Sequence, residues 1–363
     1  MRIAIDAANF VQDRRGMGRF VRSVVRAAQA DPQIEIEFIS LRRRDDAPLR
    51  AEFAGVPLQR AARVARRDAY DVVWYPWNGI RFRCAAPSLV TIHDAFAFDE
   101  PAREPIARWR EQAPIRRAAR SATKISTISQ WSAERILKAL PIERTRLVVI
   151  PLAPDPFFVL VDAAPPAALA GGAYVLLVGA REARKNARTL IAACARALHA
   201  PAERLVLVGK LSPEDARFAG ALKVPFTEID VDDDELRALY CNAAIVAVPS
   251  SAEGFGLVAV EAQACGAPVL ASNASALPEA TGGVARLLDP FDVEAWARAI
   301  RQILDDPLEA AELRLQGLAR FEHTDRMLPA LRTLELLREV AHAGAQTHRF
   351  GDERAQAFGE DRR

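Results

Sequence analysis

The chain has 363 residues, of which half are apolar and 26% are charged, and its formal net charge at pH 7 is +2. This length favours two domains, and the composition is that of an ordinary soluble protein. No stretch approaches 18 consecutive apolar residues, so we expect no membrane-spanning helix.

Cysteine and histidine usage argues against a metal centre. The four cysteines are scattered through apolar surroundings without the spacing of a metal site, and no two of the five histidines form a ligand pair. We therefore expect no bound metal, and free thiols in a reducing cytoplasm. The cysteines are Cys84, Cys194, Cys241 and Cys265.

The small net charge conceals an asymmetry between the two halves. Residues 1–158 carry 27 basic against 18 acidic side chains, whereas residues 159–363 carry 22 against 29. An excess of nine positive charges predicts an anionic partner for the first half, such as a membrane surface, a lipid phosphate or an acidic glycan. The alternative, that these charges are simply solvated, stays open.

The first half alternates short apolar runs with stretches of helical periodicity, as in a parallel doubly wound sheet. We expect residues 1–158 to form a Rossmann-like domain. The expected strands are Ile3–Ala7, Ile34–Leu41, Val72–Tyr75, Ser88–His93, Lys124–Ser129 and Arg146–Ile150, and the expected helices are Arg19–Ala30, Pro105–Arg120 and Ser132–Leu140.

A glycine-rich loop follows the first expected strand. It reads Arg14-Arg-Gly-Met-Gly-Arg-Phe20, and Gly16 and Gly18 allow the backbone to come close to a phosphate or a sugar. Two glycines at this spacing are a weak signal on their own.

A His-Asp pair, His93 and Asp94, ends the strand that begins at Ser88. Ligands of doubly wound sheets bind beyond the carboxyl ends of the strands. His93 is therefore a candidate catalytic residue, and Asp94 is a candidate for orienting it. A lone histidine is more often structural, so that alternative stays open.

The alternation of strands and helices breaks at Pro151–Phe158 and restarts after a segment rich in Ala, Pro and Gly. We interpret residues 159–172 as a linker and residues 173–323 as a second Rossmann-like domain. Its expected strands are Tyr174–Gly179, Leu205–Gly209, Phe226–Ile229, Ala244–Pro249, Pro268–Ala271 and Ala285–Leu288, and its expected helices are Ala187–Leu198, Asp233–Cys241, Val258–Cys265 and Val293–Leu304.

The end of the chain divides into two expected segments. Residues 324–344 are expected to form a long helix, with the clearest pattern at Thr324–Ala341. Residues 345–363 are polar and charged, and we expect them to form a flexible tail.

A basic loop follows the first strand of the second half. Arg181, Arg184 and Lys185 lie at a predicted helix start, where positive charge and backbone N–H groups can hold a diphosphate. Cations at a helix N-terminus oppose the helix dipole. A bound anion therefore explains them better than a solvated helix start does.

Two carboxylates flank another helix start. Glu253 follows a buried strand, and Glu261 lies about two helical turns further on, where it can face the same crevice. The turn between them offers free N–H groups that favour an anion. Its residues are Gly254, Phe255, Gly256 and Leu257. A loop carboxylate, an anion-binding helix start and a second carboxylate together suit a sugar attached to a phosphate.

This block, Glu253-Gly-Phe-Gly-Leu followed by Glu261-Ala-Gln-Ala-Cys-Gly-Ala-Pro-Val269, resembles the donor site of the retaining glycosyltransferases of family 4. The resemblance runs from about Arg2 to Ala341. It implies an α/β GT-B fold, in which two Rossmann-like doubly wound domains face a central cleft. It also implies that the helix of residues 324–344 crosses back to the first domain.

The resemblance also implies roles for these residues. Lys185 would contact the donor phosphate, and either Arg181 or Arg184 would assist it, since Ala180 stands where many relatives have arginine. Glu253 would hold the donor sugar near the reacting centre, and Glu261 would bind the ribose.

In the first half, the loop at Gly16 and Gly18 is similar to the Gly-Ile-Gly-Arg-Tyr loop of the family. The family also has a histidine near the reacting sugar at the position of His93. The resemblance therefore implies that this loop touches the donor and that His93 takes part in catalysis.

The expected activity is transfer of a hexose, first choice mannose from GDP-mannose, to a hydroxyl of a glycan or lipid-linked acceptor in surface polysaccharide synthesis. We expect no cofactor beyond this co-substrate, no metal and no nucleic-acid partner. The protein should be cytoplasmic, with peripheral association at the inner face of the membrane. The alternatives are a UDP-sugar-dependent transferase, an epimerase or phosphorylase of the same fold, and a nucleotide-binding regulator or dehydrogenase.

Overall fold

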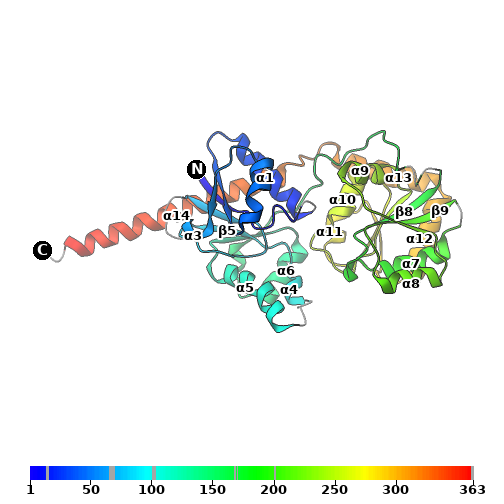
Figure 1. The fold of residues 1–363 in the computed structure, drawn as a ribbon, viewed down its shortest axis with the longest axis horizontal. Coiled ribbons are helices and arrows are strands. Elements are labelled where there is room, and N and C mark those ends of the chain that lie inside the picture. Colours follow the sequence, from blue (N-terminus) through cyan, green and yellow to red (C-terminus); the bar gives the residue numbers. More distant parts are fainter. Residues whose placement is uncertain are drawn as a thin grey trace. The chain divides into compact units, whose positions relative to one another are not determined.

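A computed structural model describes residues 1–13, 16–64, 70–99, 104–166, 169, 171–199 and 202–360. The chain forms two compact units (Figure 1). The first unit combines Met1–Leu152 with Met327–Arg363, and the second is the continuous segment Ala153–Arg326. Each unit is built on one parallel sheet.

The first sheet has seven strands in the order β3-β2-β1-β4-β5-β6-β7, and every neighbouring pair is parallel. The reversal of strand order between β1 and β4 is that of a doubly wound sheet. The strands are β1 (Arg2–Asp6), β2 (Glu35–Ser40), β3 (Leu58–Arg60), β4 (Val72–Tyr75), β5 (Ser88–Thr91), β6 (Lys124–Thr127) and β7 (Leu147–Val149).

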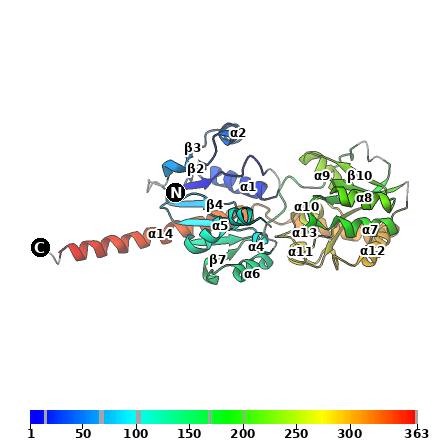
Figure 2. The ribbon, with the colours of Figure 1, turned by 60° about the horizontal axis from the view of Figure 1, so that its bottom comes forward.

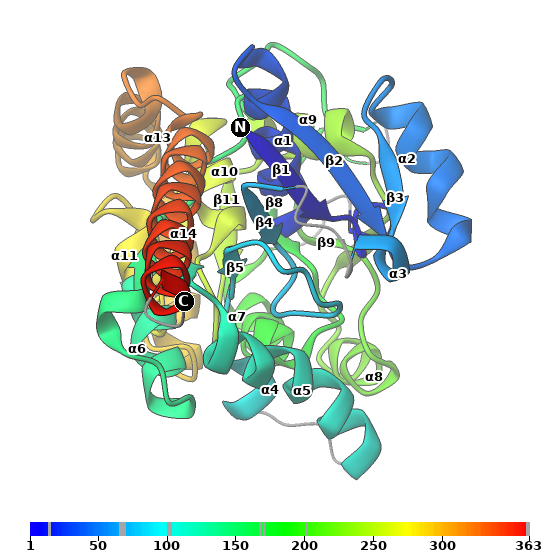
Figure 3. The same ribbon diagram turned by 90° about the vertical axis from the view of Figure 1, so that its left-hand side faces the viewer.

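Helices cover both faces of this sheet. Helix α14, seen from its carboxyl end in Figure 3, packs against α1, β4 and β5. Apolar side chains of α5 and α6 join the core on the opposite face. The helices are α1 (Met17–Ala30), α2 (Asp46–Glu52), α3 (Ala61–Val64), α4 (Phe96–Asp99), α5 (Pro105–Ser121), α6 (Gln130–Ala139) and α14 (Leu328–Glu360).

The second sheet has six strands in the order β10-β9-β8-β11-β12-β13, all parallel. They are β8 (Ala173–Val178), β9 (Glu203–Val208), β10 (Phe226–Ile229), β11 (Ile245–Val248), β12 (Val269–Ser272) and β13 (Arg286–Leu288).

Two helical layers enclose this second sheet. Helices α7, α8 and α12 lie on one side of it, and α10 and α11 lie on the other (Figures 1 and 2). The helices are α7 (Ala187–Ala197), α8 (Pro213–Ala221), α9 (Asp233–Asn242), α10 (Leu257–Ala264), α11 (Leu277–Thr281), α12 (Val293–Asp305) and α13 (Pro307–Glu322).

The division between the units differs from the predicted one. We expected Phe157 and Phe158 to close the first domain, but Phe158 is fully buried in the core of the second unit. Its ring packs edge-on against Tyr240, with 5.7 Å between centroids. The proline-rich break therefore marks the boundary, because the aromatic pair after it is needed to fill the second core.

The end of the chain also differs from the prediction. The last helix begins at Leu328 and continues through Glu360, where we expected a helix from residue 324 and a tail from residue 345. Residues 345–360 are rich in Ala, Gln, Glu and Arg, which are good helix formers. The polar composition alone was therefore a poor guide. The tail residues 361–363 lie outside the described part of the chain.

Candidate active site

A tight turn links β11 to α10 in the second unit. Gly256 caps the helix in the left-handed conformation, with φ 111°, and a Cβ there would lie 2.7 Å from a methyl group of Leu277. Only glycine fits both conditions. The first turn of α10 carries no acidic residue and no side-chain cap among the described residues, so its N–H groups can receive an anion. Gly254 and Phe255 are buried beneath it, and Leu257 is half-buried.

Glu253 lies at the centre of a buried ion cluster. Lys185 Nζ is 2.7 Å from Glu253 Oε1, and Arg184 Nη1 is 2.9 Å from Oε2. Ser250 Oγ donates to Oε1 at 2.8 Å, and the Glu253 backbone N–H donates to Ser275 Oγ at 2.9 Å. The structure thus joins three residues that the sequence placed on two separate motifs.

The charges in this cluster determine its protonation. Burial alone would raise the pKa of Glu253, but Lys185 and Arg184 outweigh burial and hold that pKa below its ordinary value. Burial would lower the pKa of Arg184, while Glu253 and Glu182 raise it. The Glu253 carboxylate is therefore ionised between two cations, and Glu182 is a second carboxylate on Arg184. Glu182, which also pairs with Arg184, is half exposed.

The structure distinguishes the two arginines that the sequence left as alternatives. Arg184 shares Glu253 with Lys185 and also donates to the Ala252 carbonyl at 3.2 Å. Arg181 is exposed and has no ion-pair partner within the described residues. Arg184 is thus the arginine next to Lys185.

Asn186 fixes the basic turn in place. It adopts the left-handed conformation with φ 54°. Its side-chain amide donates to the carbonyls of Pro249, at 3.1 Å, and Pro290, at 2.6 Å. These bonds tie the loop after β8 to the ends of β11 and β13, which brings Lys185 against Glu253.

Glu261 lies on α10 and is 4% exposed. Tyr240 Oη donates to its Oε2 at 3.3 Å. Tyr240, Ser250 and Ser275 were not predicted from the sequence, because a single tyrosine or serine carries no motif. Only the position of Ser250 at the end of a buried strand could have indicated it.

The glycine loop of the first unit lies at the start of α1. Gly16 is the residue before the helix, and Gly18 lies in its first turn. A Cβ at Gly18 would lie 1.9 Å from the Asp13 carbonyl oxygen, so no larger residue fits. Arg14 and Arg15 of the same loop lie outside the described residues. The loop follows the carboxyl end of β1, as predicted.

His93 is 1% exposed and lies just beyond the carboxyl end of β5. Its Nε2 is 2.9 Å from the Pro76 carbonyl oxygen. A carbonyl only accepts, so Nε2 carries the proton. Nδ1 then offers a lone pair, and it has no partner among the described residues. Burial lowers the pKa of His93 to about 4, so the ring is neutral.

In the described part of the chain, Asp94 makes no hydrogen bond to the ring of His93. Its Oδ1 accepts the Phe96 backbone N–H at 3.1 Å, which closes the turn into α4. The ring of His93 is instead oriented by Pro76 and by edge-on packing against Phe20, with 6.2 Å between ring centroids. A short acidic side chain directly before a helix bonds its own backbone more readily than its neighbour's ring.

Asp6, at the carboxyl end of β1, was missed by the sequence analysis. The side chain is fully buried, and burial raises its pKa to about 7 against the opposing effects of Arg81 and the Ala8 N–H. Oδ1 accepts from Ala8 N at 3.0 Å, and Oδ2 has no partner within the described part of the chain. An acid that ends an apolar strand is the signal that could have found it.

Across the described residues, no group of three or more His, Cys, Asp or Glu side chains is placed to hold a metal ion. None of the helices in that part of the chain combines the length and apolarity needed to cross a membrane.

Two Rossmann-like units, with a Glu–Lys–Arg cluster beside a helix start at the carboxyl edge of the second sheet, are what is expected of a glycosyltransferase of the GT-B class. Family models agree with this reading. The model described as Glycosyltransferase Family 4 matches residues 14–156, and the one described as Glycosyl transferases group 1 matches residues 172–306.

The chain is also similar to individual proteins. It is 31% identical to the MMP alpha-(1->4)-mannosyltransferase of Mycolicibacterium hassiacum, over 72% of this chain and 69% of the relative. It is 29% identical to the O-antigen chain mannosyltransferase B of Escherichia coli, over 70% and 71%. A crystal structure of Anabaena HepE in complex with UDP and glucose superposes with a TM-score of 0.73 at 17% identity, covering 93% and 100%. The chain belongs to the family 4 glycosyltransferases.

Proposed function

We propose that this enzyme transfers a hexose, with retention of anomeric configuration and without a metal, from a nucleotide sugar to a hydroxyl of a glycan or lipid-linked acceptor. The observation that carries the proposal is the buried cluster of Lys185, Arg184 and Glu253 beside the uncapped start of α10. Two cations beside the free N–H groups of a helix start suit a diphosphate.

Lys185 and Arg184 stabilise the leaving group in this proposal. When the donor binds, its diphosphate oxygens contact the two cations that also pair with Glu253. The same oxygens accept hydrogen bonds from the N–H groups at the start of α10. These donors are already held in place, so they stabilise the charge that develops on the phosphate without reorganisation. Because this stabilisation needs no divalent ion, activity should persist after exhaustive EDTA treatment.

The reaction breaks the bond between the anomeric carbon and the phosphate oxygen, and a bond forms to the acceptor oxygen on the same face. The acceptor proton passes to the departing phosphate oxygen, so the products are a glycoside and a nucleoside diphosphate. Glu253 holds donor hydroxyls near the developing positive charge of the sugar. His93 Nδ1, which has no partner among the described residues, accepts a hydrogen bond from a sugar hydroxyl.

We propose that the donor is GDP-mannose, that the transferred sugar is mannose, and that the enzyme acts in surface polysaccharide synthesis. The support is the similarity to two mannosyltransferases over about 70% of the chain. UDP-sugars are the second candidate, since HepE, of the same fold, was solved with UDP and glucose. Isothermal titration with GDP and UDP decides between them. A tenfold preference, about 1.4 kcal/mol, assigns the base, and tighter binding of UDP would overturn the GDP assignment.

We further propose that α5 attaches the enzyme to an anionic membrane at the inner face. Residues 105–111 are all exposed, and Ile106 and Trp109 are each 68% exposed, three positions apart on one helical face. The helix contains five arginines and a single acid, Glu111. Apolar side chains at the tip of a basic helix suit the interface of a bilayer with anionic lipids.

Vesicle sedimentation tests this attachment. Binding to vesicles that contain phosphatidylglycerol should weaken steeply with salt and should be lost in the double variant Ile106→Ser, Trp109→Ser. The matched control is Leu308→Ser, Leu315→Ser on α13, which removes two leucines that are 81% and 66% exposed. Equal binding by both variants, or no binding by the unmodified enzyme, would leave α5 as solvated surface.

A further inference from the structure

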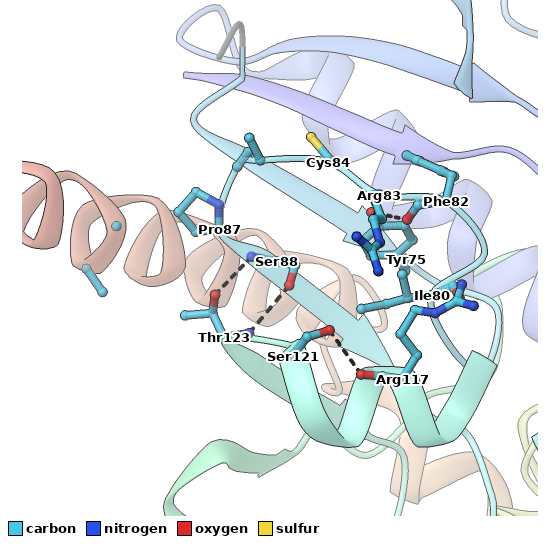
Figure 4. A pocket seen from close by; sticks show the side chains of 14 residues that line it. Tyr75, Ile80, Phe82, Arg83, Cys84, Pro87, Ser88, Arg117, Ser121 and Thr123 are labelled. Carbon is cyan, nitrogen blue, oxygen red and sulfur yellow. Dashed lines mark hydrogen bonds between the residues drawn. The ribbon is translucent and has the colours of Figure 1, made fainter. Parts of the chain in front are cut away.

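A cavity of about 770 Å³ lies within the first unit, away from the residues discussed so far. It is open to solvent and is lined by the segment between β4 and β5, by helix α5 and by the part of α14 near Gly344 (Figure 4). Cavities of a few hundred to about a thousand Å³ hold most small organic ligands. The lining residues are Tyr75, Ile80, Phe82, Arg83, Cys84, Ala85, Ala86, Pro87, Ser88, Arg117, Ser121, Thr123, Ala343 and Gly344.

The charged groups of this lining have one sign. Arg83 and Arg117 are the lining cations, and the lining contains no Asp or Glu. Figure 4 shows both guanidinium groups beside Tyr75 and Ile80. Arg117 donates to the Ile80 carbonyl at 2.9 Å, which fixes its direction, and neither arginine forms an ion pair with a described residue. The pocket therefore presents two positive charges, both on side chains that are also exposed to solvent.

Two hydroxyl groups add hydrogen-bonding capacity. Thr123 Oγ1 accepts the Ser88 N–H at 3.0 Å, and Ser88 Oγ accepts the Thr123 N–H at 3.4 Å. A hydroxyl that accepts from the backbone still has its own proton to donate. Together with Tyr75, Ile80, Phe82 and Pro87, the cavity thus combines an apolar wall with donors suited to an anion.

The position of the cavity separates it from the reacting edge of the sheet. Ser88 is the first residue of β5, and Thr123 directly precedes β6, so these polar groups lie at the amino ends of the strands. His93 lies beyond the other end of β5, roughly 16 Å further along at 3.3 Å per residue. Substrates of doubly wound sheets bind at the carboxyl ends.

We propose that this cavity is a second ligand site, separate from the donor site, for a small organic anion with a phosphate group and an apolar or planar body. Arg83 and Arg117 bind the phosphate oxygens, which planar guanidinium groups match in geometry. Tyr75, Ile80 and Phe82 contact the apolar body. The phosphate can belong to a soluble ester or to a lipid headgroup.

Isothermal titration of the full chain with phenyl phosphate tests the site. Arg83→Gln and Arg117→Gln should each weaken binding about tenfold or more, since each removes charge-assisted hydrogen bonds. The matched control is Arg120→Gln, an exposed arginine one turn along α5 that does not line the cavity. Unchanged binding in both lining variants, or no binding of the probe at all, would overturn the proposal.

Further measurements define the ligand and exclude the donor site. Phenol and inorganic phosphate should each bind more weakly than phenyl phosphate, and equal binding by inorganic phosphate would overturn the role of the apolar wall. Tighter binding of dihexanoyl phosphatidate than of phenyl phosphate would assign the site to a lipid, and the reverse order to a soluble ester. Saturating GDP and UDP should not compete, and competition by either would place the probe in the donor site instead.

A variant that fills the cavity tests whether a loss of probe binding could come from misfolding. Ala85 lines the cavity and is exposed, so Ala85→Trp should block the probe while the thermal midpoint of unfolding stays close to that of the unmodified enzyme. Undiminished binding of phenyl phosphate by this folded variant would contradict the assignment.

Discussion

The carboxyl edges of the two sheets differ in whether their buried polar side chains have partners. In the second unit, both oxygens of Glu253 are engaged by Lys185, Arg184 and Ser250. In the first unit, Asp6 and His93 each keep one buried atom with no partner among the described residues. The charged groups of the second edge are already paired and, in the proposed reaction, share their cations with the donor. The first edge has hydrogen-bonding positions that no described residue fills.

The largest effect should come from breaking the paired charges of the second edge. Glu253→Gln removes the carboxylate between two buried cations but keeps a side chain of the same shape. We expect kcat to fall on the order of 10²–10³-fold, the cost of losing one preorganised electrostatic contact. The loss of the buried pair should also lower the free energy of unfolding by about 3 kcal/mol. Steady-state kinetics and urea unfolding measure the two losses.

A matched variant sharpens this result. Arg181→Gln removes a nearby cation that is exposed, and it should change kcat less than twofold. If Glu253→Gln retained the kcat of the unmodified enzyme, the buried cluster would be a structural ion pair and the assignment of the active site would be wrong.

At the carboxyl edge of the first sheet, we expect the stability to depend on pH through Asp6. Burial raises the pKa of Asp6 from 3.8 to about 7, so the folded protein binds more protons between these values. The stability that protonation gives is present below pH 3.8 and is lost as pH rises to 7. The asparagine in Asp6→Asn does not titrate. The free energy of unfolding of this variant, relative to that of the unmodified enzyme, should therefore rise by about 2–4 kcal/mol from pH 4 to pH 8. Urea unfolding at both values measures this, and a constant difference would contradict a buried, protonated Asp6.

His93 should show the opposite sign. Burial lowers its pKa from 6.5 to about 4, so the unfolded chain binds more protons between these values. The contribution of the neutral ring to the free energy of unfolding is present above pH 6.5 and is lost as pH falls through 4. The complete loss amounts to about 2–3 kcal/mol. His93→Gln should flatten this part of the profile, while His323→Gln, at an exposed position of the second unit, should not. Equal profiles for the two variants would contradict the burial of a neutral ring.

The smallest effect is expected at Glu261. We predict that Glu261→Ala weakens nucleoside diphosphate binding about tenfold, which is the value of one hydrogen bond to a charged group, with kcat nearly unchanged. Titration calorimetry and kinetics measure the two quantities. Because Tyr240 donates to the same carboxylate, Tyr240→Phe separates positioning from direct binding. A fall in kcat with intact affinity would move Glu261 into the reacting centre.

The sequence predicted the strands of both sheets well because parallel strands, buried on both faces, read as apolar runs. Strand β3 was missed because it has three half-buried residues at a sheet edge. Helix α13 was missed although Asp306 and Pro307 are an N-cap and a first-turn proline. Its apolar spacing is weak, and those local signals were left unused.

The candidate site divides along similar lines. Lys185, Glu253 and Glu261 could be found because each lies in a motif with fixed spacing. The choice of Arg184 over Arg181 could not, since it depends on how Asn186 bonds to two distant carbonyls. Asp6 and Asp94 show the same limit: both are short acids near strand ends, and only the surrounding packing decides which one is fully buried.

The discontinuity of the first unit has a consequence for biosynthesis. Helix α14 packs on α1, β4 and β5, yet it is synthesised after the whole of the second unit. Residues 153–326 are continuous and can fold as soon as they leave the ribosome. Until its last helix is made, the first sheet lacks the part of its cover that α14 supplies over β4 and β5. During translation the second unit is therefore completed first, and the unit that was made earliest is the last to be completed.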